Sequence, residues 1–75
     1  GYIVLGNAYL MMKDLARAES NFRQSYDIAN RLKEVRFLAE SLQGFGGINK
    51  QAGKLDLSLD YLKQAEAVLD STNYR

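Results

Sequence analysis

Few side chains in this sequence could carry catalytic chemistry. Histidine and cysteine are both absent, which removes the usual general acid–base group at neutral pH and the thiolate nucleophile. Asp56 and Asp60 stand one helical turn apart and could offer oxygen ligands to a hard cation. Two carboxylates without further convergent ligands make a weak site. We therefore predict no metal site, no cofactor and no enzymatic activity.

A glycine-rich run from Gly44 to Lys50 superficially suggests a phosphate-binding loop. Both the dinucleotide fingerprint and the phosphate loop require glycine where this chain has Asn49, and no strand is expected before the run. Glycine inside a helix costs about 1 kcal/mol, so three glycines so close together indicate a packing or binding reason. We expect a kinked or flexible helix at 44–47.

Composition and charge restrict the remaining functions. The 75 residues are 47% hydrophobic and 25% charged, with ten basic and nine acidic side chains. These values are typical of one small globular domain, and no apolar run approaches the roughly 18 residues of a membrane helix. The net charge of +1 favours neither a nucleic-acid nor a membrane partner.

The sequence gives little information about the compartment or the parent protein. Without cysteine, redox chemistry assigns no compartment, and the cytoplasm is favoured only by default. No initiator methionine or signal peptide precedes the apolar pattern. We expect residues 1–75 to form a single domain that is part of a longer chain.

Apolar residues recur at three- and four-residue spacing and predict four amphipathic helices. The chain has no proline and is rich in strong helix formers. The predicted helices cover 2–12, 15–32, 35–52 and 55–69. The links between them are short, which forces antiparallel neighbours. We expect Asp14 to cap the second helix, and Gly53 to close the third in a left-handed conformation.

The same order of small and large residues occurs twice, forty residues apart, so that Gly6 recurs as Gly46. Self-similarity with such a period is the mark of a repeat architecture, in which each helix pair buries its face against its neighbours. We predict an all-α fold of two tandem antiparallel helix-turn-helix repeats that stack as an α-α superhelix. Repeat 1 covers about 1–33 and repeat 2 about 34–72.

Both units resemble the tetratricopeptide repeat, which places a large residue, Leu, Gly and Tyr on one helix and Ala, an aromatic residue and Ala on the next. The first unit matches through Tyr2, Leu5, Gly6, Tyr9, Ala18, Phe22 and Ser25. The second, more degenerate unit matches through Leu42, Phe45, Gly46, Ser58, Leu62 and Ala65. The small residues would allow close helix approach, with Phe22 and Leu62 filling the space between pairs. The period exceeds the usual 34 residues, as in the long repeats of scaffold proteins and bacterial regulators and sensor kinases.

This resemblance implies a non-catalytic protein-interaction module whose ligand lies in a concave groove lined by the first helix of each pair. The implied groove residues are Ile3, Asn7, Leu10 and Met11 in unit one, and Glu40, Gln43, Gly47, Lys50 and Gln51 in unit two. Asn7 matches a family position that commonly hydrogen-bonds a bound peptide, and an amide suits this because it donates and accepts. The form of the family that clamps a terminal carboxylate has lysine where this chain has Ile3.

Two interpretations of the apolar groove residues remain open. They could receive an amphipathic helix or an extended apolar segment of a partner protein, or they could be the face that a neighbouring repeat covers. Lys50 and Gln51 are equally compatible with a solvated helix end. Stacked repeats usually need about three units, so the chain could also form a homodimer. Its apolar edges would be the first-helix face and the set Leu57, Tyr61 and Val68.

Overall fold

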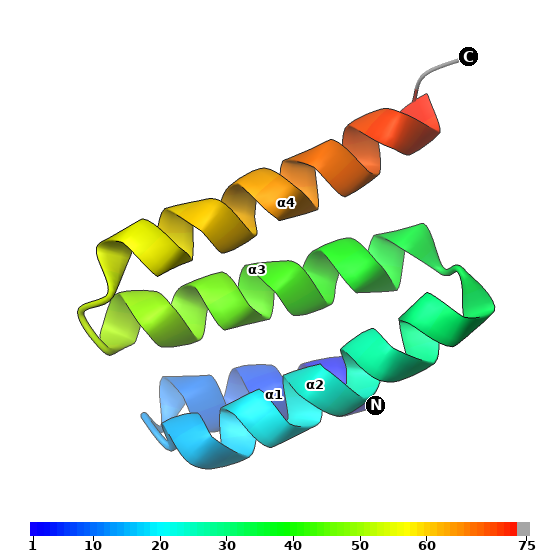
Figure 1. Ribbon diagram of the computed structural model, residues 1–75. Coiled ribbons are helices and arrows are strands. Elements are labelled where there is room, and N and C mark those ends of the chain that lie inside the picture. The colour runs from blue at the N-terminus through cyan, green and yellow to red at the C-terminus, as the bar shows by residue number, and fades with distance from the viewer. Residues whose placement is uncertain (74–75) are drawn as a thin grey trace.

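The chain folds into four helices and no strand over the part that the computed structural model describes, which is the backbone of residues 1–73 and the side chains of residues 1–70. The helices are α1 (Tyr2–Met11), α2 (Leu15–Leu32), α3 (Val35–Gln51) and α4 (Leu55–Asn73). Each runs antiparallel to the one before it (Figure 1), and α3 contacts all three others. The predicted all-α fold is confirmed; the last two residues of the predicted domain lie outside the described range.

One or two residues after the end of each of the first three helices, a residue adopts the left-handed conformation: Lys13 at φ 62°, Lys33 at φ 57° and Gly53 at φ 81°. The next backbone N–H then donates to a carbonyl five residues earlier, which satisfies a free acceptor at the helix end. These bonds join Asp14 to Tyr9 (2.9 Å), Glu34 to Ala29 (2.9 Å) and Lys54 to Asn49 (2.8 Å). The prediction for Gly53 is confirmed. The two lysines were not expected, because a Cβ disfavours positive φ.

The start of α2 is capped as predicted. Oδ1 of Asp14 accepts a hydrogen bond from the backbone N–H of Arg17 at 3.3 Å, which satisfies one of the free donors in the first turn. The Arg17 side chain returns to the same carboxylate, at 3.5 Å. Asp14 thus fixes the point at which the chain turns from α1 into α2.

The ring of Phe22, on α2, is completely buried and lies against two glycines on different helices. A Cβ built on Gly6 of α1 would stand 2.9 Å from this ring, and one built on Gly44 of α3 would stand 2.5 Å from it. Both distances are too short for real carbon atoms, so only glycine allows the ring to sit there. The helix α3 runs uninterrupted through 44–47. The glycines therefore do not interrupt the helix, and the expected packing reason is confirmed, whereas flexibility at 44–47 stays a prediction.

Aromatic contacts continue the core from α2 across α3 to α4. Phe22 meets Phe45 edge to face, with centroids 6.3 Å apart, and Phe45 meets Tyr61 at 5.4 Å. On the far side of α3, a Cβ on Gly46 would stand 3.1 Å from Leu62. The prediction that glycines allow close helix approach therefore holds in both units. Leu62 itself remains 40% exposed, whereas Phe22 in the equivalent place is fully buried.

The apolar edge predicted on α4 is only partly correct. Tyr61 and Val68 are half-buried and pack against the core, because they lie on the side of α4 that faces α3. Leu57 is 46% exposed. The exposed leucines of α4 also include Leu55, Leu59, Leu62 and Leu69, so the apolar edge of this helix is formed by leucines and not by Tyr61 and Val68.

Substitution of Gly44 tests this packing. Gly44→Ala should lower the free energy of unfolding by about 1–3 kcal/mol, because the added Cβ displaces the Phe22 ring. The matched control is Gly47→Ala, where the Cβ meets only the tip of the Leu10 side chain. There the better helix propensity of alanine, about 1 kcal/mol, should leave stability unchanged or higher. Urea unfolding followed by circular dichroism measures both, and equal effects would contradict the account.

Candidate functional site

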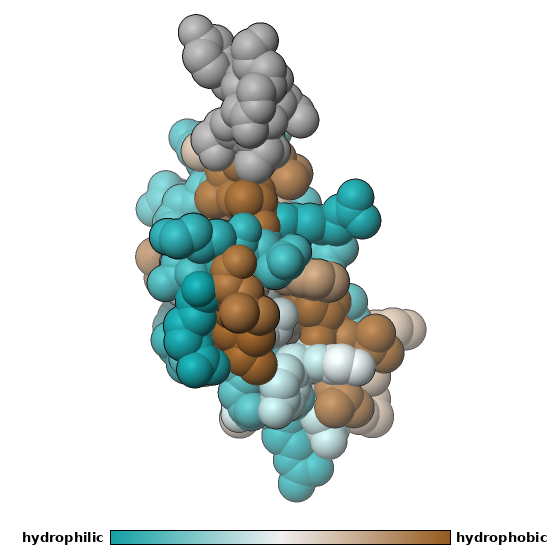
Figure 2. Space-filling model, turned by 90° about the vertical axis from the view of Figure 1, so that its right-hand side faces the viewer, coloured by the Kyte–Doolittle hydropathy of each residue, from teal (hydrophilic) through white to brown (hydrophobic). Residues whose placement is uncertain are grey.

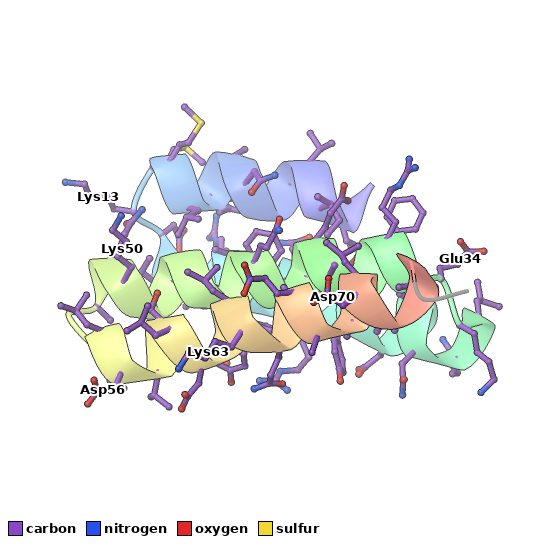
Figure 3. All side chains as sticks on the ribbon, turned by 90° about the horizontal axis from the view of Figure 1, so that it is seen from above. Lys13, Glu34, Lys50, Asp56, Lys63 and Asp70 are labelled. Carbon is purple, nitrogen blue, oxygen red and sulfur yellow. The ribbon has the colours of Figure 1, made fainter. Side chains whose placement is uncertain are left out.

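A hollow of about 240 Å³ lies between α1 and α3, which run side by side in the same direction (Figure 3). Ile3 and Asn7 line it from α1, and Glu40, Gln43 and Gly44 line it from α3. Four of the implied groove residues are therefore brought together. Gly44 was missed, although its position one turn after Glu40 and one before Gly47 places it on the same helical face.

Two side-chain amides and one carboxylate give the hollow its chemistry. Asn7 and Gln43 are exposed, and neither side chain bonds to another described residue. By contrast, Nδ2 of Asn49, also on α3, donates to the carbonyl of Phe45 at 2.8 Å. The half-buried Glu40 has no cation within ion-pair distance among the described residues. The hollow thus offers donors and acceptors to a ligand together with one negative charge.

The other half of the predicted groove is closed by contacts between its own residues. The side chain of Leu10 packs onto Gly47, where a Cβ would stand 2.9 Å from Leu10 Cδ2. Nε2 of Gln51 donates to the backbone carbonyl of Leu10 at 3.1 Å, as a second donor beside the N–H of Lys13 at 3.0 Å. Leu10, Gly47 and Gln51 join α1 to α3 and do not line the hollow.

Met11 and Lys50 lie at the end of the molecule where α1 and α3 terminate. Met11 is 84% exposed, and Lys50 lies at the same end as Lys13 (Figure 3). Neither residue lines the hollow. Ile3 and Leu10 are half-buried against the core, so the predicted apolar trio presents only Met11 as a largely exposed side chain.

The acidic pair on α4 has no further metal-ligating side chains beside it in the described part of the chain. Asp56 and Asp60 are exposed, and no group of three or more His, Cys, Asp or Glu residues able to hold a metal occurs among the described residues. Within the same range, no helix combines the length and the apolar character needed to cross a bilayer.

Antiparallel helix pairs that share one core through α3, with a polar hollow between the first helices, define a helical-repeat protein. A family model described as "Tetratricopeptide repeat" matches residues 2–71. The chain therefore belongs to the tetratricopeptide-repeat family, whose members are generally protein–protein interaction modules. No curated protein and no solved structure matches the chain.

Substitutions at two adjacent groove positions separate structural from surface roles. Leu10→Ala should lower the free energy of unfolding by about 1–2 kcal/mol, because it removes a half-buried side chain that joins α1 to α3. Met11→Ala should change it by less than about 0.5 kcal/mol, as expected for an exposed side chain. Thermal and urea unfolding of both variants measure the difference. A Leu10→Ala protein as stable as Met11→Ala would mean that Leu10 is not a packing residue.

Proposed function

We propose that this chain binds an extended segment of a partner protein in the hollow between α1 and α3 and has no catalytic role. Asn7 and Gln43 line one hollow, and their side-chain amides form no hydrogen bond with another described residue. An amide can donate to a backbone carbonyl and accept from a backbone N–H at once. An extended peptide presents both groups.

The size and polarity of the hollow favour an extended ligand over a helical one. Its volume of about 240 Å³ is below the roughly 300–1,000 Å³ typical of pockets for small organic ligands. It suits one or two side chains. A docked helix would satisfy its own backbone groups and would need an apolar groove, whereas Leu10 is already packed onto Gly47.

Glu40 supports a basic residue in the partner segment. Its carboxylate lines the hollow beside Gln43 and is half-buried, so solvent screens it less than a fully exposed charge. A lysine or arginine side chain entering the hollow would compensate this charge and bond to it directly. The partner segment is thus proposed to place a cationic side chain next to the backbone held by the two amides.

Selection from a phage-displayed library of random peptides, followed by affinity measurement on the selected peptides, tests this function. The double variant Asn7→Ala/Gln43→Ala should bind about tenfold or more weakly, because each lost hydrogen bond costs about 0.5–1.5 kcal/mol. The matched control is Ser20→Ala/Gln24→Ala, at exposed positions on α2, which should bind as the wild type does.

The selected peptides should also be rich in lysine and arginine, and Glu40→Gln should weaken their binding most at low salt. Circular dichroism on the same samples establishes that the variants remain folded. A library that yields no binder, or binders that are indifferent to Asn7 and Gln43, would refute peptide binding in this hollow.

A second candidate function, assembly through apolar edges, is favoured by the outer side of α4. Leu55, Leu59 and Leu62 are 59%, 55% and 40% exposed. Leu62 is the counterpart of Phe22, which packs against the next helix of this chain. A further repeat or a second copy could cover these leucines in the same way. If a second copy covers them, the molecular mass should rise with concentration, and Leu62→Glu should restore the monomer.

A further inference from the structure

An apolar hollow of about 320 Å³ occupies the end of the molecule where α1 begins and α2 passes into α3. Tyr2 of α1, Ile28 and Leu32 of α2, and Phe37 of α3 are its large lining residues. Figure 2 looks onto this end and shows apolar surface between polar margins. The hollow shares no residue with the polar one that contains Asn7.

The four large apolar side chains that line this hollow are all partly exposed to solvent. Tyr2 is 40% exposed, Ile28 37%, Leu32 65% and Phe37 47%. Single exposed apolar residues are normal, but several around one hollow indicate a surface that another element covers.

The internal repeat shows what covers the same place in the second unit. At an offset of forty residues, α1 (Tyr2–Met11) corresponds to the last ten residues of α3. The helix α3 has 17 residues, whereas α1 has ten. The first seven residues of α3, 35–41, have no counterpart in α1. Of the four α2 residues that line the hollow, Ser25, Ile28 and Ala29 correspond to Ala65, Val68 and Leu69 of α4.

In the second unit, the first two turns of α3 pack where the first unit has its hollow. Ala39 is 2% exposed and belongs to the same buried cluster as Leu42 and Ala65. Val68 packs against that cluster. Ala39 and Leu38 precede Leu42 by three and four residues, so they share one helical face with it. The counterpart of Leu42 is Tyr2, at the margin of the hollow.

We propose that this hollow is the seat of an amphipathic helical segment of about two turns that lies in line with α1 as a continuation of it. Its apolar residues have the spacing of Val35, Leu38 and Ala39. Because α1 and α3 are parallel (Figure 3), such a segment passes beside the start of α3, where Phe37 lines the hollow.

An extension built from the chain's own sequence tests the seat. Residues Val35–Ser41 are copied in register before Tyr2, so that the copied serine replaces Gly1. The extended chain should melt at a temperature about 5 °C or more higher, because the copied residues bury the hollow. The matched control carries the same extension with glutamine at the three positions copied from Val35, Leu38 and Ala39, and should melt as the parent chain does.

Ile28→Glu, which places a charge inside the hollow, should abolish the difference between the extended chain and its control. If Ile28→Glu does not fold, Leu32→Glu at the more exposed margin serves the same purpose. An extension that stabilises no more than its control, or a difference that survives both substitutions, would overturn the proposal. So would an unextended chain that dimerises in a manner abolished by Leu32→Glu, since a second copy would then be the occupant.

Discussion

The contact on which the rest of the structure depends is the insertion of the Phe22 ring between two glycines. Gly6 on α1 and Gly44 on α3 both leave room for this ring, and any Cβ at either position would collide with it. One side chain of α2 thereby fixes the distance between two helices that are not consecutive in sequence. Phe45 then transmits the same packing to Tyr61 on α4, so the four helices share one core.

The candidate site follows from this arrangement, because α1 and α3 line the polar hollow with the residues that lie between their packing positions. At one end, Leu10 against Gly47 and Gln51 on the Leu10 carbonyl hold the two helices together. Farther along, Asn7 and Gln43 line the hollow, and their side-chain amides form no hydrogen bond with another described residue. Residues that maintain the fold and residues available for recognition therefore alternate along the same two helices, as expected for a repeat that keeps its core while its ligand changes.

Much of this fold could be predicted from sequence, because helix periodicity, the Asp14 cap and the Gly53 turn are local signals. Non-local packing was harder to foresee. Gly44 was expected to loosen its helix because the ring that requires it, Phe22, lies 22 residues earlier in the chain. The left-handed conformation of Lys13 was also not predicted, because a lysine in the sequence does not indicate positive φ. The polar residues of the candidate site were identified from the sequence. The packing role of Leu10 was not, because it depends on the contact of Leu10 with Gly47.

The insertion of Phe22 between the two glycines can be tested by nuclear Overhauser effects from the Phe22 ring protons in solution. We expect these protons to give cross-peaks to the Hα protons of both Gly6 and Gly44, because the ring lies against both glycines. Cross-peaks to only one glycine, or to neither, would show that Phe22 does not set the spacing of α1 and α3. The origin proposed for the polar hollow would then be wrong.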